Sequence, residues 1–193
     1  MAQRKGNKKM GQYYKPILTN ANGYERVYSR DVEGEYTMAK LMEHSWWGNE
    51  FVISICRKLF RNPMKVVWVG DYADSAETTN GIEKNELKRL CKKAWGCKGS
   101  DIKFDPLRLD GLCLVNHTKK IYIDCDDYYN ECADDGWCIH PLPLLTAIGN
   151  GLGGGDYRGD NPDVGIWAND VISIERVAPE GFKEAEYIFK EEW

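Results

Sequence analysis

The segment from His140 to Trp167 concentrates residue types that could contact a ligand. Between Gly149 and Gly159 it holds six glycines, and Asn150, Asp156 and Arg158 lie among them. Glycine admits positive φ and lets backbone N–H groups approach a ligand closely. Ordering such a loop costs about 1–2 kcal/mol per residue in backbone entropy. We therefore interpret the loop as a candidate binding element.

The chemistry that suits this loop is anion binding, because backbone amides beside Arg158 would accommodate a phosphate or a carboxylate. The loop is not a Walker loop, since no G-K-[ST] closes it, and its spacing is not that of a dinucleotide fingerprint. Two alternatives stay open. Its polar groups could bond to one another, or Asp156, Asp160 and Asp163 could hold hydroxyls, amines or a metal. We expect no metal.

Aromatic and acidic residues elsewhere end strands or interrupt helices, and we expect several of them to converge with the loop on one concave site. The predicted ligand-binding residues are Tyr13, Tyr14, Trp46, Trp47, Asn150, Gly153, Gly154, Gly155, Asp156 and Arg158. If the site is catalytic, His44 or His140 would be the general base, and the acid or orienting partner would be Asp71, Asp74 or Asp156. No nucleophile elbow or H-E-x-x-H motif is present.

The second half of the chain holds acidic and cysteine-rich patterns that could suggest a metal. Asp124 to Asp135 contains five aspartates and Glu131, but it lacks the alternation and the turn glycine of a calcium loop, so we interpret it as a solvated acidic loop. Cys125, Cys132, Cys138 and His140 could be written as a zinc site, although structural zinc favours ligands two to four residues apart. We expect reduced cysteines, no stoichiometric zinc, no obligatory disulfide and no cofactor.

Strand patterns predict a largely antiparallel sheet. Residues 13–28 read as a hairpin with its turn at Asn20 to Gly23, in which Pro16 suggests an edge strand or a strand start. Lys65 to Gly70 is a short buried strand, and residues 111–125 form a second hairpin. Residues 171–177 and 186–190 read as two final strands around a turn at residues 179–181.

Two helices are predicted at about residues 49–61 and 82–95, where apolar residues recur at helical spacing. Asn49 can cap the first, and Gly96 follows the second. Trp46 and Trp47 precede the first helix. Because two adjacent residues cannot both face the core from one side of an element, one of them could line a cleft or an interface, although we favour the alternative that both pack under the helix entry. Pro141 and Pro143 predict an extended approach to the glycine-rich loop.

Composition favours a single α+β domain, with a mostly antiparallel sheet and two main helices packed on it. Residues 1–9 are expected to be a disordered basic tail and residues 10–193 the globular domain. The 193 residues contain no apolar run of membrane-spanning length and no apolar leader, so we expect a cytoplasmic location and no membrane contact.

The formal net charge of −4 hides a strong asymmetry along the chain. Residues 1–100 carry 18 Lys and Arg against 11 Asp and Glu, a net of +7, whereas residues 101–193 carry 8 against 19, a net of −11. The two halves could complement each other in one fold, or the acidic half could face a basic partner such as a nucleic-acid-binding protein. Direct nucleic-acid binding is not expected.

Five motifs together resemble an uncharacterised family of bacteriophage and Gram-positive gut-bacterial proteins: G-Q-Y-Y-K-P-I from Gly11, L-M-E-H-S-W-W-G-N, V-V-W-V-G-D-Y-A-D, V-N-H-T-K-K, and H-P-L-P-L-L-T followed by G-N-G-L-G-G-G-D-Y-R-G. The resemblance spans nearly the whole chain from Met10. It supplies no catalytic residues. It implies a phage accessory protein in a host cytoplasm, which raises the expectation of interference with a host defence system.

Two classes of function follow. In the first, which we favour, the protein is a binder that either sequesters a small anionic nucleotide-like ligand or masks a basic surface of a host defence protein. In the second it is an enzyme, a hydrolase or a transferase, acting on a nucleotide-derived substrate.

Overall fold

The computed structural model describes residues 12–32, 35–37, 39–75, 81–133, 138–150, 162–187 and 189. The expected basic tail, residues 1–9, lies outside them. The described strands are β1 Tyr14–Thr19, β2 Glu25–Val32, β3 Glu35–Thr37, β4 Met64–Gly70, β5 Ser100–Asp101, β6 Cys113–Asn116, β7 Ile121–Asp124, β8 Ala147–Ile148, β9 Val171–Glu175 and β10 Lys183–Glu184. The helices are α1 Glu50–Leu59, a 3-10 turn Ala73–Ser75, α2 Lys84–Trp95, α3 Cys125–Cys132 and α4 Pro141–Leu145.

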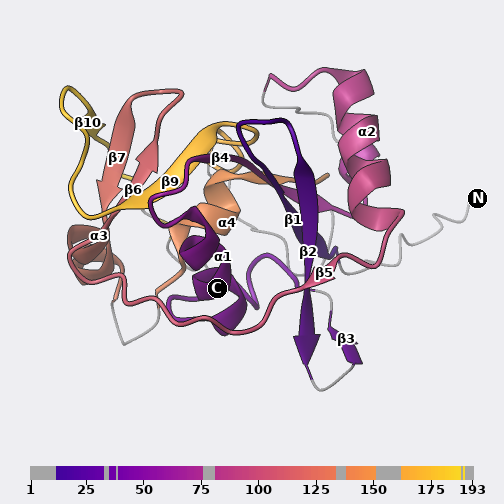
Figure 1. Ribbon diagram of the computed structural model, residues 1–193, viewed down its shortest axis with the longest axis horizontal. Helices are drawn as coiled ribbons and strands as arrows, with labels where there is room; N and C mark the ends of the chain where they lie inside the picture. The colour runs from indigo at the N-terminus through magenta and orange to yellow at the C-terminus, as the bar shows by residue number, and fades with distance from the viewer. Residues whose placement is uncertain are drawn as a thin grey trace, which may run out of the picture.

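All of these strands belong to one sheet, in the order β10-β7-β6-β9-β4-β1-β2-β3, with β5 added beside β2 and β8 beside β4 (Figure 1). Most pairs are antiparallel, and the parallel pairs are β10 with β7, β5 with β2 and β8 with β4. The predicted α+β fold with a mostly antiparallel sheet is confirmed. No helix among the described residues is long and apolar enough to cross a membrane.

Both predicted hairpins are confirmed. β1 pairs with β2 around a turn in which Gly23 adopts a φ of 77°, a value that glycine tolerates without strain. β6 pairs with β7 around residues 117–120. Tight turns of this kind bring neighbouring segments together with little loss of chain entropy, which is why local sequence patterns are sufficient to predict them.

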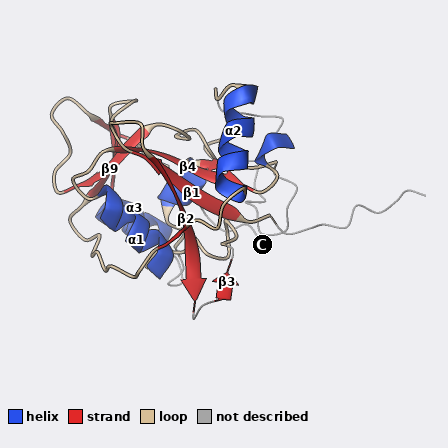
Figure 2. Cartoon of the chain, turned by 45° about the vertical axis from the view of Figure 1, so that its right-hand side comes forward, coloured by secondary structure: helices blue, strands red, loops and turns tan. Residues whose placement is uncertain are grey.

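The sheet has an apolar core on each face, and β4 is therefore buried on both sides. Val66 and Trp68 point into a large core with α1, α3 and α4, whereas Val67 and Val69 point into a smaller core with α2. Successive side chains of a strand point to opposite faces, so a continuous apolar run predicts this burial. Figure 2 shows α2 on the opposite side of the sheet from α1 and α3.

Helices α1 and α2 confirm the two sequence predictions. Asn49 caps α1, and its side-chain oxygen accepts from the N–H groups of Phe51 and Val52 at 3.0 and 3.3 Å. In α2 the buried residues Leu87, Leu90, Cys91 and Ala94 lie at helical spacing, and Gly96 follows the last turn.

The acidic segment after β7 is a helix and not the solvated loop that its composition suggested. Asp124 caps α3 by accepting from the N–H groups of Asp126 and Asp127 at 2.9 and 3.2 Å. Acidic residues are favourable in the first turn of a helix, where the backbone N–H groups are unpaired. Cys125, Tyr128 and Cys132 form the buried face at positions i, i+3 and i+7.

The Pro141–Leu145 segment is also helical, which corrects the predicted extended approach to the glycine-rich loop. His140 caps α4, and Pro141 occupies the first helical position, where the missing N–H of proline would have no intrahelical partner in any case. Both prolines therefore sit in the first turn, where they are compatible with a helix.

Two strand predictions are wrong in detail. Pro16 lies in an interior strand, since β1 pairs with both β2 and β4. Proline is tolerated there because the described β1–β2 ladder covers only Ile17 to Thr19. Pro16, which has no N–H to donate, lies beyond the end of that ladder. Among the described residues the last strand is Lys183–Glu184, and Tyr187 and Phe189 lie after it. Their side chains contact the large core, which accounts for the apolar alternation.

Candidate functional site

The start of β1, the end of β4 and the segment after β8 meet around the buried side chain of Gln12. Its Oε1 accepts from the Tyr14 hydroxyl at 3.1 Å and from the N–H of Asn150 at 3.3 Å. The amide thus joins the first strand to the segment that leads into the glycine-rich loop. A fully buried amide needs such partners, because an unpaired one would lose its hydration without compensation.

Two glycines make room for Gln12. A Cβ on Gly70 would lie 2.8 Å from Gln12 Nε2, and a Cβ on Gly149 would lie 2.7 Å from Gln12 Oε1 and still closer to the Tyr14 hydroxyl. Real Cβ atoms do not approach side-chain atoms this closely. At Gly149, the first glycine of the loop, the residue type is therefore explained by packing against the protein's own side chains.

Four predicted site residues come together in this region, here called the Gln12 region (Gln12, Tyr13, Tyr14, Asp71, Ser75 and Asn150). Asp71 donates its N–H to the Tyr13 carbonyl at 3.0 Å, and its Oδ1 accepts from the Tyr13 N–H at 3.2 Å. Asn150 Nδ2 donates to Ser75 Oγ at 3.3 Å. Asp74 is exposed in the adjacent 3-10 turn. Gly153, Gly154, Gly155, Asp156 and Arg158 lie outside the described residues.

A second group of predicted site residues surrounds Trp47. Its ring lies 5.0 Å from that of His140 and 5.9 Å from that of Tyr128, both in stacked orientation, and 5.5 Å from that of Tyr129. Trp46 forms a β-bridge with Ile139, and His140 donates its N–H to the Ser45 carbonyl. Both tryptophans are half-buried, so they serve to hold the turn before α1 against α3 and α4.

His140 is buried and carries out a structural task. Its Nδ1 accepts from the Leu142 N–H at 3.1 Å, so the neutral ring carries its proton on Nε2, which faces the Cys56 thiol at 3.5 Å. Burial lowers the pKa of His140 to about 3 and raises that of Cys56. The ring is neutral and sealed from solvent at neutral pH, which disfavours a role as general base.

His44 is partly exposed, and its Nδ1 accepts from the Lys40 N–H at 3.0 Å. This bond holds the turn that precedes Trp46. The nitrogen that a general base would use is therefore occupied in this conformation.

His117 was not among the predicted site residues, and it lies in a polar chain with two residues of β9. His117 Nε2 lies 2.7 Å from Ser173 Oγ, and that hydroxyl donates to Glu175 Oε1 at 2.7 Å. In a hydrolytic triad the carboxylate would instead orient the histidine, and the serine would face the substrate. Because Ser173 is fully buried and donates to Glu175, we interpret this polar chain as a structural link between the β6–β7 turn and β9.

The described residues form an acidic cleft of about 170 Å³ between α3 and the segment after β10. Five carboxylates line it, with Ile123, Tyr128, Ala185 and Tyr187 as its apolar walls: Asp124, Asp127, Glu131, Glu184 and Glu186. Asp124 is engaged in capping α3, and Glu184 accepts from the Tyr122 hydroxyl at 3.2 Å. None of the five forms an ion pair with a Lys or Arg of the described chain.

No family model, curated protein or solved structure matches the chain. Function must therefore be inferred from the contacts, charge and burial of its own residues. Within the described ranges, no group of three or more His, Cys, Asp or Glu side chains is placed to hold a metal ion. All seven cysteines are free thiols.

Proposed function

We propose that the protein is a binding protein whose acidic cleft receives basic side chains of a partner protein. The observation that carries this proposal is the cleft itself, in which five carboxylates surround apolar and aromatic walls without a described internal counter-ion. Clefts lined by one sign of charge focus the electrostatic field and raise the rate of association with oppositely charged partners.

The sheet order supports the same proposal. Strands β10, β7, β6 and β9 form one end of the path and come from the acidic half of the sequence, whereas β4, β1, β2 and β3 come from the first half (Figure 1). The strands at this end of the sheet therefore come from the half of the sequence whose net charge is −11, and those at the other end come from the half whose net charge is +7. The cleft lies at the acidic end.

The walls of the cleft suit a lysine or an arginine. Tyr128 and Tyr187 present aromatic surface beside the carboxylates, and cations bind favourably over aromatic rings. The guanidinium group of arginine is planar and pairs with two carboxylate oxygens at once. In the phage setting that the sequence resemblance implies, the partner would be a basic host defence protein, for example one that binds nucleic acid.

Binding is favoured over catalysis by the positions of the two candidate bases. His140 is buried, and the Nδ1 of His44 is already bonded to the backbone. The other binding hypothesis, a small nucleotide-like ligand held by the glycine-rich loop, depends on Gly153 to Arg158, which lie outside the described residues.

The test uses a fluorescent nona-arginine peptide as a basic probe and measures its anisotropy at increasing NaCl. The triple variant Asp127→Asn, Glu131→Gln, Glu186→Gln removes three cleft charges. A matched control, Asp74→Asn, Glu83→Gln, Asp110→Asn, removes three exposed charges elsewhere. We expect the cleft variant to lose about ten-fold in affinity and the control to change by less than about two-fold. Equal losses would show that only net charge matters and would overturn the proposal.

Partner identity is tested by affinity purification from a bacterial lysate, with quantitative mass spectrometry of wild type and cleft variant. A basic protein that is retained by wild type and lost in the cleft variant supports the proposal. The purified protein is then denatured by heat, and the released small molecules are identified by mass spectrometry. Release of a nucleotide, with no partner protein retained, would contradict the proposal and favour the glycine-rich loop as the binding site.

A further inference from the structure

Three arginines surround one aromatic ring where α1 ends against β9. The guanidinium carbons of Arg57, Arg61 and Arg176 lie over the Phe60 ring, 5.6, 5.9 and 5.7 Å from its centroid. These three residues with Phe60 are here called the arginine cluster. A ring has only two faces, so at least two of the guanidinium groups share one. All three arginines are exposed, and Phe60 is half-buried.

Backbone contacts bring these residues together from distant parts of the chain. Phe60 forms a parallel β-bridge with Ile174, and the Arg61 N–H donates to the Ile174 carbonyl at 2.9 Å. Arg176 follows two residues later, just after β9. The favourable field at a helix C-terminus explains basic residues in the last turn of α1, such as Arg57. It does not explain Arg176, which comes from another element.

Arg61 also occupies a backbone position that is unfavourable for an arginine. Its φ is 53°, in the left-handed region, where glycine or asparagine is favoured directly after a helix. A non-glycine residue loses roughly 1 kcal/mol or more in this conformation. The arginine side chain is thus presented at a strained position, a pattern that is frequent at functional sites.

The cluster is only partly neutralised. Arg57 forms an exposed ion pair with Asp105, with 3.4 Å between Nε and Oδ2. Within the described part of the chain, no carboxylate forms an ion pair with Arg61 or Arg176. Like charges held near one another repel, and a bound anion would remove that repulsion.

We propose that the arginine cluster is a binding site for a phosphate group. Guanidinium groups donate parallel N–H bonds that match phosphate oxygens, and several groups around one point can contact different oxygens of a tetrahedral anion. The site lies outside the acidic cleft, so it does not depend on the function proposed above. The phosphate could belong to a small molecule or to a nucleic-acid strand.

Inorganic pyrophosphate is the first probe, titrated calorimetrically and followed by amide chemical shifts in phosphate-free buffer of low ionic strength. We expect shifts at residues 57–62 and 174–177, and an affinity that falls about ten-fold for each guanidinium removed in Arg61→Gln and Arg176→Gln. The charge-matched control Lys84→Gln, Lys88→Gln lies on α2, across the sheet (Figure 2). It should bind as wild type does.

Further arms separate charge from geometry and identify the source of the phosphate. The double variant Arg61→Lys, Arg176→Lys keeps both charges, loses the planar fork and should bind with intermediate affinity. A single-stranded oligonucleotide is titrated in the same way. If it binds more tightly than pyrophosphate through the same residues, the phosphate belongs to nucleic acid. If the oligonucleotide binds more weakly than pyrophosphate, the phosphate belongs to a small molecule. Three results would overturn the proposal. They are chemical-shift changes confined to residues outside the cluster, a loss of pyrophosphate affinity in the α2 control as large as in the cluster variants, and an affinity for malonate equal to that for pyrophosphate. If Arg61→Gln impairs folding, Arg176→Gln alone provides the test.

Discussion

At the scale of single residues, burial decides what each polar side chain can do. His140 and Gln12 have the polar atoms of ligand-binding residues, but the protein's own backbone and side chains occupy those atoms. The exposed arginines around Phe60 show the opposite case, since Arg61 and Arg176 have no described carboxylate partner. Residue type therefore indicates possible chemistry, and burial determines whether that chemistry is available.

Replacement of His140 should reduce the acid sensitivity of the fold. The folded state keeps this imidazole neutral down to about pH 3, whereas the unfolded chain takes up a proton near 6.5. Stability is therefore fully present above 6.5 and is lost as pH falls below it, by up to about 1.4 kcal/mol per pH unit. Asparagine retains helix capping without titrating.

Urea unfolding of wild type and His140→Asn, from neutral pH to about pH 5, measures this effect. We expect a flatter pH dependence in the variant even if its free energy of unfolding at neutral pH is lower from lost packing. His44→Asn is the matched control, since it makes the same substitution at a partly exposed ring. An unchanged slope in His140→Asn would contradict the assignment.

Gly149→Ala should destabilise the Gln12 region. The added methyl would overlap the Tyr14 hydroxyl and Gln12 Oε1. Overpacking of this kind costs about 1–3 kcal/mol. The measurement is urea unfolding of Gly149→Ala, Tyr14→Phe and the double variant. Because Tyr14→Phe removes the nearest obstructing atom, the double variant should lose less than the two single losses combined. Simple additivity would show that the hydroxyl does not constrain Gly149.

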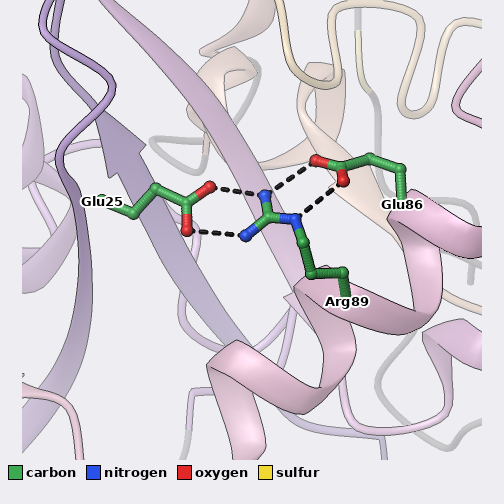
Figure 3. Close-up of polar contacts among 3 residues, drawn as sticks. All are labelled: Glu25, Glu86 and Arg89. Atoms are coloured by element: carbon green, nitrogen blue, oxygen red, sulfur yellow. Dashed lines mark hydrogen bonds and ion pairs between the residues drawn. The ribbon is translucent and has the colours of Figure 1, made fainter.

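At the scale of elements, side-chain contacts hold α2 to the sheet at the middle of the helix and at its C-terminal end. Arg89 donates through Nη1 and Nη2 to Glu25 on β2, at 2.8 and 2.5 Å, and through Nε to Glu86 at 2.7 Å (Figure 3). At the C-terminal end of α2, Lys15 of β1 donates to the carbonyls of Ala94 and Cys97 at 3.3 and 3.1 Å. Burial lowers the pKa of Lys15. A cation beside helix C-terminal carbonyls is favourable.

A double-mutant cycle of Arg89→Ala and Glu25→Ala should give a coupling energy of about 1 kcal/mol, since the pair is bidentate but partly exposed. The hydrogen bond from Arg89 lowers the pKa of Glu25 below its usual 4.5. The coupling is therefore present above pH 4.5 and is lost as pH falls through the lower folded value. Unfolding experiments at neutral and acidic pH measure it. A coupling that is insensitive to pH and to salt would contradict the ion pair.

At the scale of the whole molecule, the sheet separates two apolar cores. The larger core holds α1, α3 and α4 on one face, and the smaller core holds α2 on the other. The strands of the acidic half occupy one end of the sheet path. The acidic cleft and the arginine cluster are both built from elements that meet only in this tertiary arrangement.

The same arrangement predicts the reactivity of the cysteines. Six are buried and Cys97 is exposed. Burial raises the pKa of Cys56, Cys91, Cys113 and Cys125, which suppresses the reactive thiolate. We expect one fast-reacting thiol in the native protein with a maleimide reagent, none in Cys97→Ser, and all seven in wild type after denaturation. Mass spectrometry counts the labels. Several fast thiols in the native protein would contradict the described core.

The sequence by itself determined the elements whose signals are local. The turn glycine Gly23, the cap Asn49 and the apolar run of β4 act within a few residues, so their consequences can be derived without long-range contacts. The continuous apolar run of β4 also implies burial on both faces, although it does not say which helix covers which face.

Only the tertiary structure decided the roles of polar residues. The sequence predicted that Asp124 belongs to a solvated loop. In the structure it caps α3, whose other face is buried. His140 looked like a base, and its burial beside Cys56 made it a neutral cap. Arg176 reaches Phe60 because β9 meets the end of α1, a contact between residues more than a hundred positions apart. Such outcomes depend on burial and long-range packing, which residue type and spacing do not encode locally.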